Sequence, residues 1–451
     1  MNTTDFITLL HREVVPAIGC TEPMCVALCV ARAKEKLGKL PDSITVYLSK
    51  NIYKNAMAVG IPATDMTGLP IAIALGATIG NSNYGLEVLK DATADNVQYA
   101  KQYLRRVHPE IRIDTNAPDI LYVHTVVATQ DGQSAQATIQ GTHDHFIDND
   151  HADNHGATAE TNSPSATDSL DSLNISSLRE VYDFALNVPL HHVNFLMDGA
   201  KMNMAAAEKS FMGTYGHGLG RLLHTVSNQH LNNTQPTQIS NIFGDTLFTK
   251  ILCYTCGACD ARMAGAMIPV MSNSGSGNQG ISCSIPVYLY ALEHNCDEEL
   301  TLRALTLSNL TVIYIKQSLG RLSALCGCVV AATGSAAGLT YLMGGQYDEI
   351  TFAIKNMIAN ISGMICDGAK PACALKVTSG VATAVLSATM AINHSFAEAT
   401  EGIVEQDIDR TIHNLTRIGH DAMTQTDNLI IDIMTHKTDI MTHKTDIKTR
   451  K

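Results

Sequence analysis

Three cysteines in the C-terminal third of the chain could hold an iron–sulfur cluster. Cys326, Cys366 and Cys373 lie 40 and then 7 positions apart, so the last two share one turn and the first comes from a second element. Thiolates are the ligands that such clusters prefer, and a cluster with three protein ligands leaves one iron open to a substrate atom. The spacing therefore suggests a catalytic cluster. Cys328 follows Cys326 closely, so either of the two could be the remaining ligand.

Cys20 is a second candidate for chemistry. It lies in the segment Pro16-Ala-Ile-Gly-Cys-Thr-Glu-Pro23, directly before a predicted helix. The positive end of a helix lowers the pKa of a nearby thiol and favours the thiolate, which would make Cys20 a candidate base. Alternatively, Cys20, Cys25 and Cys29 form a stripe of small packing residues. The spacing alone leaves both interpretations open.

A third group of thiols follows a C-x2-C-x2-C pattern and comprises Cys253, Cys256 and Cys259. The pattern is known from ferredoxins, but the x3-C-P that follows there is missing. The flanking sequence predicts a continuous helix, in which such cysteines serve as small apolar packing residues. We therefore favour packing over cluster ligation for this group.

The turn Gly275-Ser-Gly-Asn-Gln-Gly280 matches the G-x-G-x-x-G pattern of dinucleotide sites. Such a site needs a strand before the turn and a βαβ context, whereas the surrounding sequence predicts almost no strands. A dinucleotide-dependent oxidoreductase that uses Gly275, Gly277 and Gly280 stays as an alternative from another class of function. The small residues would also let backbone N–H groups approach a carboxylate or a phosphate.

Composition limits the class of ligand and the compartment. The chain has 451 residues and a formal net charge of −12, which argues against nucleic acid and anionic membranes as partners. Twelve cysteines and the absence of a signal-peptide pattern at the N-terminus predict a reducing, cytoplasmic location. The longest uncharged window, residues 322–347, is interrupted by glycines. It predicts buried helix rather than a membrane span.

The N-terminal part predicts a mixture of helices and strands. Residues 3–38 predict a helix that is broken near Pro16. Strand-like alternation occurs over 44–49, 120–128 and 135–140, and the last two runs are separated by the strong hairpin turn Asp131-Gly132.

The expected fold class is α+β, in which an N-terminal α/β unit with a small mixed sheet precedes an all-α catalytic unit. The α+β unit spans 1–147, and a polar loop or linker spans 148–172. The all-α unit, which would bind the cluster, spans 173–433. Residues 434–451 carry two copies of a seven-residue repeat and are expected to be a disordered tail.

Several segments together resemble the L-cysteine desulfidase family, which is related to the iron–sulfur L-serine dehydratases. The segments that carry the resemblance are unusual in composition and extend along most of the chain: 16–23, Lys54-Asn-Ala-Met-Ala-Val-Gly-Ile-Pro62, Asp260-Ala-Arg-Met263, Ser272-Asn-Ser-Gly-Ser-Gly-Asn-Gln-Gly280 and Cys366-Asp-Gly-Ala-Lys370.

The resemblance implies one [4Fe–4S] cluster per subunit, held by Cys326, Cys366 and Cys373, and no pyridoxal phosphate. It implies that Cys20 is the catalytic base. The reaction would convert L-cysteine and water to pyruvate, ammonia and sulfide. The candidate substrate-binding residues are Lys54, Asn55, Ser274, Ser276, Asn278 and Gln279.

Two further functions stay open beside this lyase and the dinucleotide enzyme. One is an L-serine or L-threonine dehydratase of the same cluster type, and the other is a non-enzymatic scaffold of zinc and cysteine. The serine-rich motif of the dehydratases is missing, and Gly-Cys-Thr-Glu stands instead, which favours cysteine as substrate. The expected partner is a small amino acid, with no nucleic acid and no membrane, and the protein is expected to be a homodimer.

Overall fold

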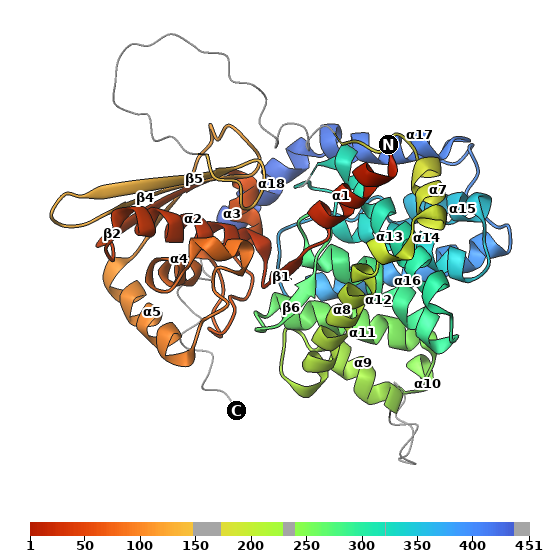
Figure 1. Ribbon diagram of the computed structural model, residues 1–451, viewed down its shortest axis with the longest axis horizontal. Coiled ribbons are helices and arrows are strands. Elements are labelled where there is room, and N and C mark those ends of the chain that lie inside the picture. Colours follow the sequence, from red (N-terminus) through yellow and green to blue (C-terminus); the bar gives the residue numbers. More distant parts are fainter. Residues whose placement is uncertain (148–172, 229–239, 321, 437–451) are drawn as a thin grey trace, which may run out of the picture.

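The computed structural model describes residues 1–147, 173–228, 240–320 and 322–436 (Figure 1). The expected linker at 148–172 and residues 437–451 of the expected tail lie outside this part of the chain. The described residues form an α+β unit with a small mixed sheet and a larger helical unit, which confirms the predicted fold class.

The α+β unit is built on a four-stranded sheet in the order β3-β2-β4-β5. The strands are β2 (Ser43–Leu48), β3 (Glu110–Ile113), β4 (Tyr122–Ala128) and β5 (Ser134–Gln140). β2 runs parallel to β3 and antiparallel to β4, which forms a hairpin with β5. The three predicted strands are confirmed within two residues at each end, and burial alternates along β2 and β4 but not along β5. The short edge strand β3 was not predicted, because it has only two apolar residues.

Helix α2 (Thr21–Leu37) covers one face of this sheet through β4 and β5. Cys25 and Cys29 on α2 are fully buried there, and the Cys29 thiol donates to the carbonyl oxygen of Ala137 at 3.3 Å. These two cysteines are therefore packing residues. The remaining helices of the unit are α3 (Lys50–Ala56), α4 (Leu69–Thr78), the 3-10 helix η1 (Ser82–Glu87) and α5 (Ala94–Val107).

The helical unit is arranged around α14, which packs against α12, α13, α15 and α16. Its small side chains, mostly alanine, glycine, serine and threonine, let these neighbours approach closely. The helices are α7 (Leu178–Asn187), η2 (Leu190–His192), α8 (Phe195–Met212), α9 (Leu219–Asn228), α10 (Ser240–Phe243), α11 (Leu247–Met263), α12 (Gly277–Glu293), α13 (Glu298–Leu319), α14 (Gly327–Leu342), α15 (Tyr347–Ile361), α16 (Cys373–Ile392), α17 (Ile408–Arg417), η4 (Ile418–Ala422) and α18 (Thr424–Thr435).

Helix α16 is long and apolar enough to cross a membrane, judged by length and composition alone. It packs against α11, α14 and α15 within the helical unit, and 44% of its most apolar window is buried. Its position is therefore that of a helix with one face in the core of this unit.

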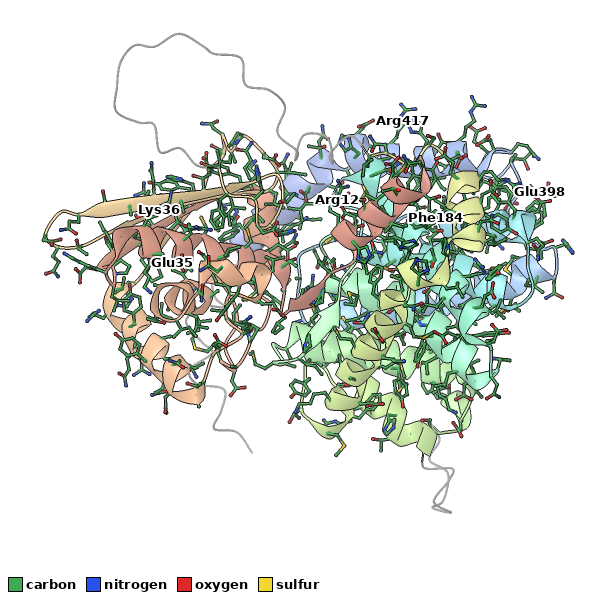
Figure 2. The ribbon with its side chains drawn as sticks, in the orientation of Figure 1. Arg12, Glu35, Lys36, Phe184, Glu398 and Arg417 are labelled. Carbon is green, nitrogen blue, oxygen red and sulfur yellow. The ribbon has the colours of Figure 1, made fainter. Side chains whose placement is uncertain are left out.

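Both ends of the described chain connect the two units: the N-terminal residues pack on the helical unit, and the C-terminal helix α18 contacts α3 of the α+β unit. Helix α1 (Thr3–Glu13) packs on the helical unit, where Phe6 stacks on Phe184 of α7 with ring centroids 4.5 Å apart (Figure 2). Strand β1 (Pro16–Ile18) pairs antiparallel with β6 (Pro269–Met271). The sequence division assigned these first residues to the α+β unit, but their apolar side chains are buried against helices that come much later in the chain.

Candidate active site between the two units

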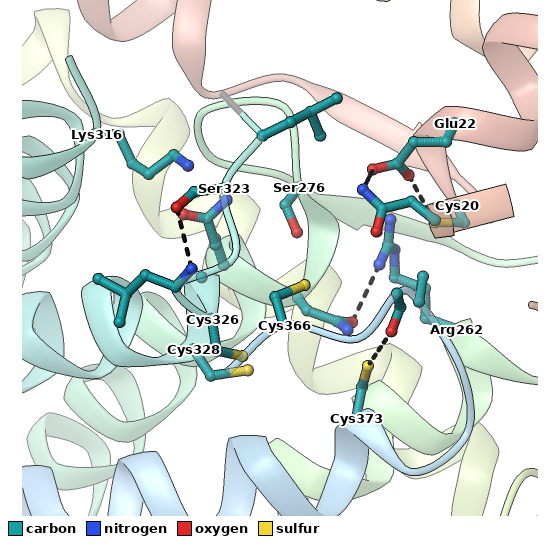
Figure 3. Close-up of a pocket in the computed structure, with 18 residues that line it drawn as sticks. Cys20, Glu22, Arg262, Ser276, Lys316, Ser323, Cys326, Cys328, Cys366 and Cys373 are labelled. Carbon is teal, nitrogen blue, oxygen red and sulfur yellow. Dashed lines mark hydrogen bonds between the residues drawn. The ribbon is translucent and has the colours of Figure 1, made fainter. Parts of the chain in front are cut away.

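A cavity of about 100 Å³ lies where the two units meet. Cys20 and Glu22 at the start of α2 and Asn55 on α3 line one side, and the helical unit supplies the rest (Figure 3). The lining residues of the helical unit that carry polar groups or thiols are Arg262, Ser276, Asn278, Gln279, Lys316, Ser323, Cys326, Cys328, Cys366 and Cys373. The cavity therefore brings together residues from segments that are far apart in the sequence.

Backbone pairing brings the first two candidate cluster ligands together. The N–H of Cys326 donates to Met364 at 2.9 Å, and the N–H of Cys366 donates to Ala324 at 2.7 Å. Cys326 also occupies the N-cap position of α14, without a side-chain capping bond, and Cys373 is the first residue of α16. The three thiols thus come from the ends of elements rather than from one helix, and all three line the cavity.

The loop that carries Cys366 is fixed against α3. Gly368 has φ +89°, and a Cβ there would lie 2.3 Å from the carbonyl oxygen of Lys54. The ammonium of Lys54 donates to the carbonyl oxygen of Cys366 at 3.4 Å and forms an ion pair with Asp427 of α18. Lys54 was expected to bind the substrate, but it does not line the cavity and is 1% exposed. It supports the Cys366 loop from behind.

The donor set fits an iron–sulfur cluster in chemical type. Four thiols, from Cys326, Cys328, Cys366 and Cys373, face one cavity, and thiolates are the ligands of such clusters. Among the described residues, no group of three or more His, Cys, Asp or Glu side chains is arranged to hold a single metal ion. A cubane is wider than one ion, so its ligands surround a larger space than a mononuclear site would need.

Cys326 is the most acidic of these thiols. A hydrogen bond from Cys328 lowers the pKa of Cys326 to about 7, against the effect of burial, and Lys376 and Lys370 assist. The same pair interaction, with burial, raises the pKa of Cys328 far above its ordinary value. Burial raises the pKa of Cys373 to about 11. Cys326 is therefore the member of the Cys326 and Cys328 pair that is closer to the thiolate form a ligand requires.

Cys20 lies at the N-cap of α2, as the sequence predicts, but its thiol is not acidified. Burial and the neighbouring Glu22 carboxylate raise the pKa of Cys20 well above its ordinary value. The thiol donates to Oε2 of Glu22 at 2.9 Å. The expectation of a stable thiolate is therefore wrong, because burial and a like charge outweigh the helix N-terminus. Cys20 is nevertheless on the cavity wall, unlike Cys25 and Cys29.

Glu22 is held in its ionised form by several neighbours. Burial raises its pKa, but the charge of His143 and the hydrogen bond from Cys20 outweigh this, so that the pKa of Glu22 is lowered. Its other oxygen, Oε1, accepts a hydrogen bond from the amide of Asn55 at 3.2 Å. The Thr21 hydroxyl donates to Oε2 at 3.0 Å. Cys20 and Glu22 thus form a preorganised thiol–carboxylate pair.

The glycine- and serine-rich turn lies beside the Cys20 segment, at the start of α12, and the Thr21 hydroxyl donates to the carbonyl oxygen of Gly275 at 3.0 Å. Ser276, Asn278 and Gln279 line the cavity as expected. Ser274 does not, because its hydroxyl donates to Oδ1 of Asn273 at 2.8 Å and it lines a neighbouring cavity instead. Arg262 of α11 reaches the same wall and donates to Oδ1 of Asn278 at 3.1 Å.

Sequence reasoning missed three charged residues of the cavity. Glu22 and Arg262 lie inside segments 16–23 and 260–263, two of the segments that carry the resemblance to the desulfidase family. Their position in these segments was the one sequence signal that could have identified them as site residues. Lys316 was missed because its helix otherwise predicts plain core packing; it is 6% exposed.

The remaining two motifs have structural explanations. Cys253, Cys256 and Cys259 lie on the continuous helix α11, are buried, and do not line the cavity, which agrees with the packing interpretation. A strand, β6, does precede the G-x-G-x-x-G turn, contrary to expectation. However, β6 pairs antiparallel with β1 in a two-stranded ribbon and not in a parallel βαβ unit. The topology of a dinucleotide site is therefore missing here.

Comparison with known proteins identifies the family. The model of the serine dehydratase alpha chain family matches residues 83–432. A UPF0597 protein of Phocaeicola vulgatus is 55% identical over 435 residues, which are 96% of this chain and 97% of that protein. One from Bacteroides thetaiotaomicron is 54% identical with the same coverage, and one from Aeromonas hydrophila is 43% identical over 437 residues and 96% of each chain. The chain belongs to the serine dehydratase alpha chain family.

Proposed function

We propose that the protein is an iron–sulfur-dependent β-elimination lyase that acts on L-cysteine. The observation that carries the proposal is the single cavity in which Cys326, Cys366 and Cys373 face the Cys20 and Glu22 pair. Membership of a family of dehydratases, which is generally linked to iron–sulfur clusters, supports a lyase-type function.

A cluster held by Cys326, Cys366 and Cys373 would supply a Lewis acid for the leaving group. The rest of the chemistry falls to the chain. Oε2 of Glu22, 2.9 Å from the Cys20 sulfur, is the group that can accept the thiol proton, and the sulfur then takes the proton from Cα of the substrate. This transfer costs free energy, because the pKa of Cys20 is raised and that of Glu22 is lowered, but the thiolate is a strong base toward the Cα proton once it forms.

The electron pair of the broken Cα–H bond forms a double bond between Cα and Cβ. The Cβ–S bond breaks at the same time, and sulfide leaves as HS⁻. The resulting 2-aminoacrylate tautomerises to an imine, which water hydrolyses to pyruvate and ammonia.

L-Serine is the second candidate substrate, and the family description favours it. The same residues would remove the same Cα proton, and hydroxide would leave instead of sulfide. We favour L-cysteine because the segment around Cys20 reads Gly-Cys-Thr-Glu, whereas the dehydratases carry a serine-rich motif.

The test is turnover by the protein purified and reconstituted with iron and sulfide without oxygen. We expect sulfide and pyruvate to form in equal amounts from L-cysteine, with a higher kcat/KM than for L-serine. The activity should decay in air and return after anaerobic treatment with ferrous iron and a reductant. Full activity of an iron-free, chelated preparation would overturn the mechanism, and a preference for L-serine would overturn the choice of substrate.

A further inference from the structure

Arg262 is a buried cation whose hydrogen-bonding groups are only partly satisfied by the protein. It is 3% exposed, and its Nη1 donates to the neutral amide of Asn278. Its Nε is buried without a hydrogen-bond partner, and among the described residues it forms no close ion pair with a carboxylate, although its charge helps to lower the pKa of Glu22 on the same cavity. Burying a charge in this way is costly unless a partner arrives. A guanidinium presents a planar fork that suits a carboxylate, so an anionic ligand with that geometry is the natural partner.

The start of α12 adds a second feature that favours an anion at the same place. This helix has 17 residues, and its N-cap, Ser276, makes no side-chain capping bond. The first N–H groups of a helix and its positive end attract anions. A Cβ on Gly277 would lie 2.3 Å from Nε of Arg262, so the guanidinium lies directly against the first residue of the helix. Only glycine leaves room for it.

Gln279 supplies a neutral acceptor on the same cavity. It is 4% exposed, and its Oε1 is buried without a hydrogen-bond partner. An amide oxygen in this state suits a ligand that donates hydrogen bonds, such as an ammonium group. Glu22, the carboxylate of this cavity, is already hydrogen-bonded to Cys20, Thr21 and Asn55.

We propose that Arg262 and the start of α12 bind the α-carboxylate of the substrate and that Gln279 accepts a hydrogen bond from its α-ammonium group. The cavity then selects 2-amino carboxylic acids and rejects amides, esters and decarboxylated amines of the same shape. This inference rests on the proposed function for the identity of the leaving group, and it names the substrate class of the same site.

The test is calorimetric binding of L-alanine and L-alaninamide to the anaerobically reconstituted protein. L-Alanine carries the carboxylate and the ammonium group but has no leaving group, so binding is measured without turnover. We expect L-alanine to bind and L-alaninamide to bind much more weakly. Arg262→Gln should weaken L-alanine binding by about 10- to 100-fold, as expected for a lost charge-assisted hydrogen bond, with unchanged iron content.

Arg32→Gln is the matched control. Arg32 also has a buried Nε without a hydrogen-bond partner, but its guanidinium lies 4.6 Å from the ring centre of Phe146 and it does not line the cavity. This change should leave L-alanine binding unaltered. Equal losses in the two variants would show a general effect of removing arginine and would overturn the proposal.

Asn278→Asp keeps the proposal testable if Arg262→Gln does not fold. The new carboxylate would pair with Arg262 at the position where Asn278 now accepts a hydrogen bond. It should occupy the guanidinium and weaken L-alanine binding about tenfold or more without unfolding the protein. Unchanged L-alanine binding in a folded Arg262→Gln or Asn278→Asp protein would overturn the inference. Binding that depends on Arg262 without turnover of L-cysteine or L-serine would support the inference and overturn the proposed function.

Discussion

Two groups of three cysteines in this chain have opposite environments. Cys253, Cys256 and Cys259 lie three positions apart on the middle of α11, where the helix is buried. The thiol of Cys253 donates to the carbonyl oxygen of Gly220 at 3.3 Å, and that of Cys256 donates to the carbonyl oxygen of Cys253 at 3.5 Å. Burial raises the pKa of Cys256 to about 12. This group has the spacing of a ligand set, but none of its three members lines the cavity.

Cys326, Cys366 and Cys373 have a less regular spacing and a more reactive environment. Cys326 lies at the start of α14 and Cys373 at the start of α16, and Cys366 lies in the loop that is hydrogen-bonded to Ala324. All three line one cavity. Lys370 and Lys376 lie near them and lower the pKa of Cys326. The comparison shows that a group of thiols becomes a candidate ligand set through its position at element ends and its charged neighbours. Regular spacing on a helix mainly reflects packing.

The strongest test of this comparison is to remove one thiol from each group. Cys326→Ser, Cys366→Ser or Cys373→Ser should abolish both bound iron and activity, because a cluster with two protein thiolates is poorly held. Cys253→Ala and Cys256→Ala should keep the iron. Iron content and visible absorbance after anaerobic reconstitution measure both outcomes.

Loss of iron in Cys253→Ala or Cys256→Ala alone would reverse the assignment of the two groups. Cys259 is less suitable for this control. Its pKa is raised by burial first, but also by the charge of Cys373, so it lies close to the second group.

Cys20 provides the next largest effect, because it lies on the cavity but outside both groups. Cys20→Ala should keep the iron and the fold and should lower kcat by roughly two to four orders of magnitude, the usual cost of removing an acid–base group. Exchange of the substrate Cα hydrogen with deuterated solvent should disappear in the same variant. Cys25→Ala is a matched control, since Cys25 is buried on the same helix away from the cavity.

Near-normal turnover by Cys20→Ala would show that Cys20 is a packing residue. Glu22 would then be the residue to test as the base, because it lines the cavity and is held ionised. Lys54 is less suitable as a base, because its ammonium is engaged with Asp427 behind the cavity wall.

The sequence predicted the features that depend on local patterns. Alternation along β2 and β4 identified the sheet, and Cys20 was correctly expected at the start of a helix. Features that depend on distant segments could not be predicted. The pairing of β1 with β6 joins two three-residue strands, and each is too short to show a pattern.

The chemistry of individual residues was equally dependent on distant contacts. Lys54 was expected in the site because it belongs to a distinctive segment, but its ion pair with Asp427 joins residues 373 positions apart. The pKa of Cys20 was predicted in the wrong direction, because the helix N-terminus is visible in the sequence and burial is not. The start of a helix can therefore be predicted from the sequence, whereas the protonation state of a residue there cannot, because it depends on burial and on distant neighbours.

The ion pair behind the Cys366 loop should contribute to stability as well as to the position of the loop. Asp427→Asn would leave the buried ammonium of Lys54 without its charged partner, at a cost of about 3–5 kcal/mol in the free energy of unfolding. The double variant Lys54→Met with Asp427→Asn should cost less, because the uncompensated charge is gone. Denaturant unfolding of the anaerobic protein measures both.

An exposed ion pair supplies the contrast for this measurement. Lys250 and Glu293 lie 2.9 Å apart with side chains that are more than one third exposed, so Glu293→Gln should cost about 1 kcal/mol or less. A similarly small cost for Asp427→Asn would mean that the pair with Lys54 does not hold the Cys366 loop.

The last prediction concerns the packing group itself. Cys253→Ala removes one buried sulfur and the weak hydrogen bond to Gly220, so it should lower the free energy of unfolding by about 1–2 kcal/mol with unchanged iron and kcat. Cys253→Ser should cost more, because a hydroxyl is harder to bury than a thiol. If the serine variant were instead as stable as the native protein, the site around Cys253 would be polar and open to a ligand. The interpretation of Cys253, Cys256 and Cys259 as packing residues would then be wrong, even if the assignment of the cluster ligands were correct.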